Sequence, residues 1–200
     1  MTTADGVDGG PDVVLLPDWL APAAAAALFD ALHADLPWQV HRVRMFGREI
    51  DAPRLSCWIG DPGAAYRYSG MRHAPHPWPP VLGPLRGRLA AETGADFNSV
   101  LANLYRDGRD RMGWHSDDEP ELGPRPLIAS LSLGATRRFA LRHRRDAGRR
   151  LMLELPHGSL LLMRGDTQVE WHHALPGTTR PVGARINLTF RVVRAPAPPP

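Results

Sequence analysis

Residues Arg185 to Arg191 read RINLTFR, and this heptapeptide has the clearest strand pattern in the chain. Polar residues at every second position, from Arg185 to Arg191, alternate with apolar residues that begin at Ile186. Because neighbouring side chains of a strand point to opposite faces, the polar and apolar groups are separated. The apolar face predicts a strand packed on a core. An edge strand with a solvated polar face is the alternative on this pattern alone.

Six more segments after Phe97 have the length and composition of strands and are separated by glycine and proline: SVLANLY, PLIASLSLG, RRFALRHR, LMLELP, SLLLMR and QVEWHHAL. Strands that follow one another without intervening helices form an antiparallel sandwich or barrel, whereas a parallel sheet needs crossover helices. We therefore predict a mainly β (α+β) protein with a double-sheet jelly-roll core.

The amino-terminal half is expected to add two supporting helices and a β extension. Alanine-rich sequence from Pro22 to Ala34, capped by Asp18, has helical spacing, and a second helix from about Leu82 to Thr93 ends at Gly94. Short alternating pieces between Val40 and Tyr68 predict hairpins. The expected division is a disordered amino terminus (1–10), helices and β extension packed on the core (11–96), the jelly-roll core (97–194) and a disordered tail (195–200).

Composition points to one soluble domain. The 200 residues are 43% hydrophobic, which provides enough apolar material for a core. No apolar run approaches the roughly 18 residues of a membrane-crossing helix, and acids stand where a secretory signal carries basic residues. A cytoplasmic protein is therefore expected. Its single cysteine, Cys57, leaves neither an internal disulfide nor a cysteine-rich zinc site.

A metal site is suggested by His115 and Asp117, which would point to the same side of an extended chain. His173, near the end of QVEWHHAL, supplies a third ligand. Two histidines and one carboxylate form the facial triad of non-haem iron(II), which leaves three coordination positions open. Zinc is the alternative, but catalytic zinc usually leaves one position open and needs a base beside its water.

The polar face of RINLTFR predicts an anion site. Arg185 and Arg191 on the inward face of a barrel would be unfavourable unless an anion met them. A planar guanidinium binds a carboxylate through two parallel hydrogen bonds, so a dicarboxylate would use both arginines. On SVLANLY, Asn103 and Tyr105 share one face and can donate to the same ligand.

In their order along the chain, these segments resemble the AlkB family of oxidative dealkylation enzymes. The matching pieces are Asn103-Leu-Tyr105, His115-Ser-Asp117-Asp-Glu119, IASLSLGATRRFALRHR, HGSLLLM, WHHALP and RINLTFR. The resemblance implies a double-stranded β-helix, which is a jelly roll, with iron(II), 2-oxoglutarate and dioxygen as cofactor and co-substrates. In this family the third iron ligand precedes a small residue and Leu-Pro, as His173 does, and this favours His173 over its rival His172.

By resemblance, each predicted site residue acquires a role. His115, Asp117 and His173 become the iron ligands and catalytic residues. The contacts to 2-oxoglutarate become Asn103, Tyr105, Arg185, Asn187, Thr189 and Arg191. Arg185 would hold the distal carboxylate, and Arg191 the carboxylate near the metal.

The amino-terminal half resembles, less closely, the nucleotide-recognition lid of the family. Met45-Phe46-Gly47 resembles the hairpin tip that duplex-acting members insert into DNA, and Tyr66-Arg67-Tyr68 resembles the segment that stacks on the damaged base. Phe46 and Tyr68 as ordinary core residues are the alternative. Glu119 resembles the acid that faces the base, and a carboxylate would favour cationic 1-methyladenine and 3-methylcytosine.

The arginines between Arg137 and Arg150, Arg142 among them, predict a cationic patch suited to phosphate, with a solvated loop as the alternative. The resemblance implies demethylation of alkylated DNA, in which 2-oxoglutarate decarboxylation drives hydroxylation of an N-methyl group and formaldehyde is released. The alternatives are the same chemistry on RNA such as tRNA, a substrate other than nucleic acid, and a non-catalytic nucleic-acid-binding module. We expect a monomer that contacts no membrane.

Overall fold

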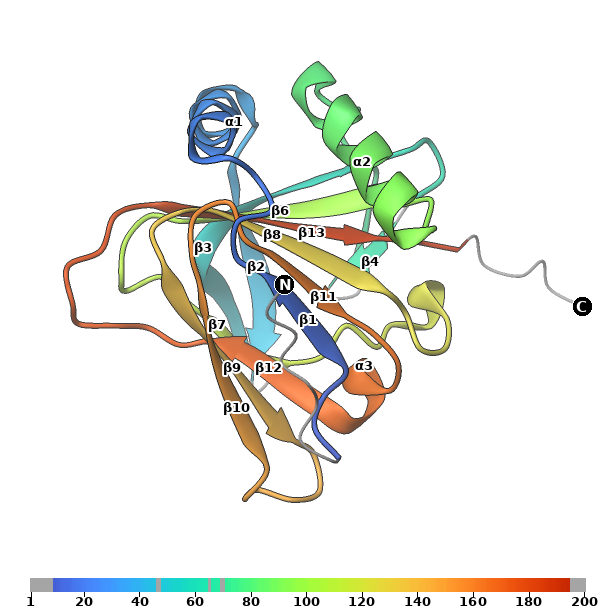
Figure 1. Ribbon diagram of the computed structural model, residues 1–200, viewed down its shortest axis with the longest axis vertical. Coiled ribbons are helices and arrows are strands. Elements are labelled where there is room, and N and C mark those ends of the chain that lie inside the picture. Colours follow the sequence, from blue (N-terminus) through green and yellow to red (C-terminus); the bar gives the residue numbers. More distant parts are fainter. Residues whose placement is uncertain (1–8, 46–47, 65, 69–70, 195–200) are drawn as a thin grey trace, which may run out of the picture.

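Two antiparallel sheets face each other in the computed structural model, which describes residues 9–45, 48–64, 66–68 and 71–194 (Figure 1). The larger sheet has the order β1-β11-β8-β13-β6-β3-β2, and the smaller has the order β10-β9-β12-β7. The strand bounds are β1 Val13–Leu16, β2 Gln39–Met45, β3 Arg48–Gly60, β6 Ser99–Tyr105, β7 Met112–His115, β8 Ile128–Gly134, β9 Arg137–His143, β10 Arg150–Leu155, β11 Leu160–Met163, β12 Trp171–Leu175 and β13 Arg185–Arg191. This arrangement confirms the predicted jelly roll.

The heptapeptide RINLTFR forms β13, in the middle of the larger sheet. It pairs with β6 on one side and with β8 on the other, and all its residues are buried. The edge-strand alternative is therefore wrong. A central strand has its backbone groups paired on both sides, so the surroundings of β13 are set by what packs on its polar and apolar side-chain faces.

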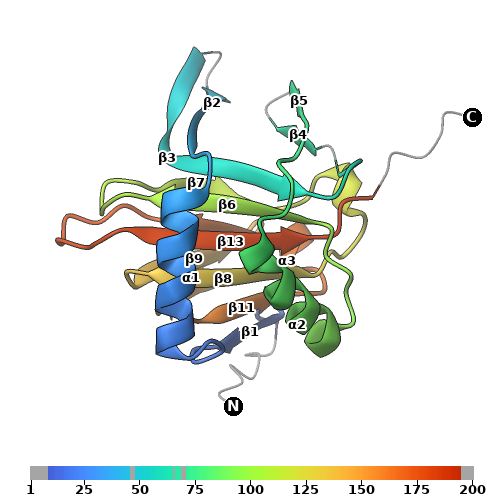
Figure 2. The ribbon, with the colours of Figure 1, turned by 90° about the horizontal axis from the view of Figure 1, so that it is seen from above.

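Two helices cover the outer face of the larger sheet (Figure 2). They are α1, Pro22–Asp35, and α2, Gly83–Thr93, which follows the 3-10 turn η1, Pro80–Leu82. The apolar residues that join the helices to the sheet are Leu28, Leu32, Leu85, Leu89, Val100, Leu104, Leu131, Leu133, Ile186, Leu188 and Phe190. The apolar face of β13 thus packs under the helices, and its polar face turns toward the smaller sheet.

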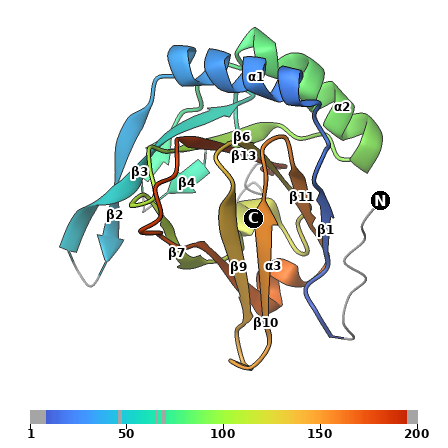
Figure 3. The ribbon, with the colours of Figure 1, turned by 60° about the vertical axis from the view of Figure 1, so that its left-hand side comes forward.

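Figure 3 shows the two sheets facing each other, and a second apolar cluster packs between them. Its members include Tyr105, Ile128, Phe139, Leu141, Met163, Trp171 and Leu175. This cluster surrounds the polar face of β13 with apolar side chains and keeps it away from solvent.

Three short elements differ from the sequence prediction. β7 was not among the predicted strands, and it is a strand because its backbone pairs with β12. The first part of QVEWHHAL forms the helical turn α3, Thr167–Glu170, in which Val169 is exposed. β1 was not predicted; it pairs with β11 along its full length and extends the larger sheet.

The predicted helix positions are confirmed, but the predicted cap is wrong. Ala21 is the residue that precedes α1, and Pro22 begins the helix without a side-chain cap, so Asp18 has no capping role. Proline suits the first helical position because its missing N–H would have no partner there. α2 ends, as predicted, at Gly94, whose φ of 72° is left-handed.

The amino-terminal half is continuous with the core sheet. β2 and β3 form a hairpin, and β3 pairs with β6, so strands from the predicted 11–96 segment belong to the same sheet as those of 97–194. A separate two-stranded sheet holds β4, Tyr66–Tyr68, and β5, Met71–His73. Disorder was expected for residues 1–10 and 195–200. The described part contains residues 9 and 10 of the first segment, and the second segment lies outside it. No helix of the described chain is long and apolar enough to cross a membrane.

Candidate active site

A pocket lies between the two sheets and brings together every residue predicted to hold the metal or the co-substrate. These residues are Asn103, Tyr105, His115, Asp117, His173, Arg185, Asn187, Thr189 and Arg191. β6 and β13 supply one wall, and β7, β12 and the segment after β7 supply the other. Alternation explains the concentration of polar groups, because the polar faces of both β6 and β13 turn inward.

Pairing between β7 and β12 builds the proposed metal triad. His115 and His173 are direct cross-strand partners, and their ring centroids lie 4.2 Å apart. A ligand atom from each of His115, Asp117 and His173 lies within 4.8 Å of the other two. His172, the next residue on β12, points to the opposite face, as neighbouring residues of a strand do. The geometry therefore favours His173 as the third ligand.

The two histidines differ in how their rings are fixed. Nδ1 of His115 lies 2.8 Å from the carbonyl oxygen of Gly113, and an N–H at that position leaves Nε2 to bind a metal. The ring of His173 stacks on Phe139 at a centroid distance of 5.3 Å. Burial, followed by the charge of His115, lowers the pKa of His173 to about 3. A neutral imidazole is the form that binds a metal ion.

Arg191 holds the carboxylate of the triad. Its Nη2 donates to Oδ1 of Asp117 at 2.7 Å, and both side chains are only 5% exposed. Burial alone would raise the pKa of Asp117, but the positive charge of Arg191, with His173 and His115, lowers it to about 2. Gln168 also holds Asp117 in place, because its Oε1 accepts a hydrogen bond from the backbone N–H of Asp117 at 2.9 Å. An ionised carboxylate beside neutral imidazole fits the donor set of iron(II).

Arg185 lies toward the other end of the pocket and is 2% exposed. Its Nη2 donates to Oγ of Ser132 at 2.9 Å, and its Cζ lies 5.3 Å from the ring centroid of Tyr105. Within the described residues it forms no ion pair, and its buried Nε has no hydrogen-bond partner. Burial lowers its pKa to about 10, which still leaves it charged at neutral pH. A buried guanidinium of this kind fits the carboxylate of a ligand.

The polar residues between the two arginines have different roles. Oδ1 of Asn103 accepts a hydrogen bond from Nε of buried Arg54 at 2.9 Å, which leaves the amide N–H groups of Asn103 to donate. Asn187 already uses its amide within the protein: Nδ2 donates to Oγ of Ser130 at 2.8 Å, and Oδ1 accepts from Thr189 at 3.0 Å. Asn187 thereby positions Thr189, and it also lines the pocket, so its contact with 2-oxoglutarate stays a prediction.

Sequence reasoning missed four residues that support the pocket: Arg54, Ser130, Ser132 and Gln168. The two serines alternate with leucines along β8, so the pattern used for β13 would have found them. Arg54 and Gln168 have no such signal, because their partners lie far away in sequence.

Comparison with known proteins agrees with this geometry. Residues 12–191 match the family model of the 2OG-Fe(II) oxygenase superfamily. The human protein named DNA oxidative demethylase ALKBH2 is 40% identical over 181 residues, which cover 86% of this chain and 69% of that protein. The chain belongs to the AlkB family.

Other relatives place the AlkB-family chain in the same group. Alpha-ketoglutarate-dependent dioxygenase alkB homolog 3 of Bos taurus is 42% identical over 190 residues, 90% of this chain and 66% of its own length. The chain thus spans about two thirds of the length of the curated relatives it matches. A solved structure of OsALKBH1, 19% identical, has a TM-score of 0.59 and covers 90% of this chain and 98% of that one, which confirms the fold. Family membership confirms the predicted enzyme class and, with it, iron(II), 2-oxoglutarate and dioxygen.

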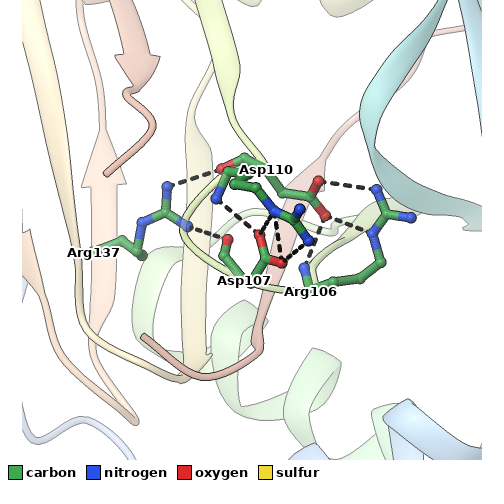
Figure 4. Close-up of polar contacts among 5 residues, drawn as sticks. Arg106, Asp107, Asp110 and Arg137 are labelled. Atoms are coloured by element: carbon green, nitrogen blue, oxygen red, sulfur yellow. Dashed lines mark hydrogen bonds and ion pairs between the residues drawn. The ribbon is translucent and has the colours of Figure 1, made fainter. Parts of the chain in front are cut away.

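One arginine of the predicted cationic patch is part of the scaffold of the AlkB-family chain. Arg137 is 3% exposed and donates to three carbonyl oxygens, those of Asp107 at 3.1 Å, Asp110 at 2.9 Å and Pro176 at 2.8 Å. Figure 4 shows it beside the loop in which Arg106 bonds the carboxylate of Asp110. Arg137 thus joins the loop after β6 to the loop after β12, and its assignment to a phosphate-binding patch is wrong.

Of the predicted substrate residues, Glu119 and Arg142 have described side chains that do not line the pocket, and the other three lie outside the described part. Phe46 lies outside the described residues; Tyr66 and Tyr68 belong to β4, but their side chains lie outside the described part as well. Glu119 is half-buried and directly precedes the 3-10 turn η2, Pro120–Leu122. Arg142 lies on β9, and its guanidinium covers Trp114 at 4.3 Å from the ring centroid. The roles of these residues in substrate binding stay predictions.

Proposed function

We propose that this AlkB-family chain demethylates N-alkylated bases in DNA, of the 1-methyladenine and 3-methylcytosine type. It would couple decarboxylation of 2-oxoglutarate to hydroxylation of the N-methyl group, which then leaves as formaldehyde. The observation that carries the proposal is one buried pocket that contains both a His-Asp-His triad and two arginines suited to a dicarboxylate. The choice of DNA rests on relatives named DNA oxidative demethylase ALKBH2.

His115, Asp117 and His173 would hold the iron. Bound iron(II) supplies the activation of dioxygen and the oxidation of the methyl group. The protein would supply the three ligand atoms, which lie within 4.8 Å of one another. Phe139 packs on the ring of His173 and limits its rotation, so the imidazole is oriented before the metal arrives.

The co-substrate would lie between Arg191 at the metal end and Arg185 at the distal end. Arg191 is anchored by its bond to Asp117, so it is already ordered when a carboxylate approaches. Arg185 is buried beside Ser132 and Tyr105, where a second carboxylate would neutralise its charge. A dicarboxylate would engage both guanidinium groups, whereas a monocarboxylate would engage only one.

Apolar side chains would keep water from the reacting methyl group. Leu101, Met112, Phe139, Met163 and Leu175 line the same pocket as the triad. A dry site strengthens the charge interactions of both arginines and protects the reaction from solvent. Within the same proposal, Glu119 faces the cationic base, Tyr66 or Tyr68 stacks on it, and Phe46 enters the duplex. A monomeric, cytoplasmic protein completes this proposal.

The direct test is succinate release with a methylated oligonucleotide. Wild-type chain with iron(II), ascorbate and 2-oxoglutarate should release succinate and formaldehyde in equal amounts and restore the unmodified base. His115→Ala should abolish both products, whereas His33→Ala, on the outer helix α1, should change neither. Product formation by His115→Ala at the wild-type rate would contradict the metal assignment.

Matched methylated strands distinguish the possible polymers. Single-stranded DNA, duplex DNA and RNA of one sequence should give turnover in that assay, with the highest kcat/KM on DNA. A higher kcat/KM on RNA would contradict the DNA assignment and leave the chemistry intact. Strand binding by a wild-type chain that released no succinate would favour the non-catalytic binding module.

A further inference from the structure

The outer face of the smaller sheet carries a row of four side chains that ends at the edge strand β7, which also supplies His115 of the triad. Arg150 of β10 and Arg142 of β9 are cross-strand partners, and Arg142 is likewise the partner of His172 on β12. Trp114 lies on the edge strand β7 and directly precedes His115 of the triad. We call these residues, Arg150, Arg142, His172 and Trp114, the Trp114 row.

Trp114 is an unusual residue for this position. It is 43% exposed, although a large aromatic side chain on a strand usually packs against the protein. The guanidinium of Arg142 lies 4.3 Å from its ring centroid, which is within the range of a cation–π contact. This contact restrains the ring without burying it. The remaining surface of Trp114 is therefore available to a second planar group.

The arginines of the row carry charge that the described protein does not neutralise. Arg142 and Arg150 stand directly opposite each other, an arrangement that is destabilising for like charges. Neither forms an ion pair with any acid in the described ranges. The acids Asp118 and Glu154, which flank the row, already face Arg144 at 2.5 Å and Arg138 at 3.9 Å. A bound anion would relieve the repulsion within the row.

We infer that the Trp114 row binds the nucleotides that flank the target base. This inference rests on the proposed function. Trp114 would stack on a neighbouring base, and Arg142 and Arg150 would bind the phosphates that follow it. An aromatic platform beside backbone-binding arginines is the combination that holds single strands, and it is tolerant of sequence. Trp114 and His115 are neighbours on the edge strand β7 but point to opposite faces, so a strand that passes around this edge would place one base on Trp114 and the next in the pocket.

Three variants and a control test the row by fluorescence anisotropy, with a labelled single-stranded DNA decamer at several salt concentrations. Trp114→Ala should weaken binding by about 5-fold to 150-fold without changing the salt slope, since stacking contributes about 1 to 3 kcal/mol per base. Trp114→Phe should keep most of the affinity. Arg142→Gln should lower the slope of log K against log salt by about 0.7, the loss of one phosphate contact. Arg138→Gln, on the same face but beside Glu154, should change neither quantity.

The outcomes separate the row from the proposed function. Binding by Trp114→Ala and Arg142→Gln equal to that of the wild-type chain would overturn the row, and succinate release with a methylated decamer would still support the demethylase. A wild-type chain that bound the decamer through Trp114 but released no succinate would support the row and overturn the demethylase. Failure of the wild-type chain to bind any strand would overturn both. Melting curves of all four variants would show that each is folded.

Discussion

Replacing Arg137 by methionine should destabilise the protein strongly while leaving most of the side-chain volume in place. The guanidinium donates to three carbonyl oxygens, one bond fully buried and two partly buried. A hydrogen bond from a charged group contributes about 1.5 to 3 kcal/mol, and less where water reaches it. The expected loss in the free energy of unfolding is therefore about 3 to 5 kcal/mol. For a chain of 200 residues this lowers Tm by about 6 to 20 °C.

The measurement is thermal unfolding of Arg137→Met by circular dichroism, with urea unfolding as a second probe of the same free energy. Arg109→Met is the matched control, because this arginine lies in the same loop, its side chain is 90% exposed, and it bonds the carboxylate of Asp107. The control should keep the wild-type Tm. A Tm for Arg137→Met within about 2 °C of the wild type would refute the claim that Arg137 joins the two loops.

Further changes have defined outcomes. Arg185→Met should raise KM for 2-oxoglutarate at least about 10-fold in initial-rate assays while iron affinity is kept, because a buried charge partner is lost. Gly108→Ala places a Cβ 2.5 Å from the carbonyl oxygen of Thr178 and should destabilise by about 1 to 3 kcal/mol in urea, whereas Gly87→Ala, with open space in α2, should stabilise by about 0.5 to 1 kcal/mol. For the metal-free chain, the pKa of His173 near 3 means that the unfolded state binds a proton which the folded state does not. The free energy of unfolding should therefore fall as pH drops from about 6.5 toward 3, by up to about 1.4 kcal/mol per unit, and urea curves that did not depend on pH would contradict this.

Alternation along single strands made much of the pocket predictable from the sequence. β13 and β6 each carry polar groups on one face. The prediction that these groups line a pocket needed only one assumption about topology, that both polar faces turn inward. The two helices were equally predictable from the sequence, because helical spacing and a terminal glycine are local signals. Spacing alone did not decide whether His172 or His173 is the third metal ligand, and the resemblance to the family favoured His173.

Features that depend on pairing between distant segments were not predictable in this way. β7 contains only four residues, including Gly113 and Trp114, and is a strand because β12 pairs with it. Arg54 bonds Asn103 because β3 pairs with β6, and no local sequence pattern predicts that pairing. Arg137 looked like surface charge because it stands in an arginine-rich segment, and its burial follows from three carbonyl groups supplied by two other loops.

The strict alternation of β13 places two sets of residues under different constraints, one set by packing against the helices and one by the pocket. Ile186, Leu188 and Phe190 contact the helices, so exchanges among apolar residues there would tune stability and leave the chemistry of the pocket unchanged. Arg185 and Arg191 are under the opposite constraint, since they line the pocket and are not part of the helix-facing core. Deletion of a single residue would exchange the two faces and remove both properties together. β13 should therefore tolerate apolar exchanges on its helix-facing side but no change in length.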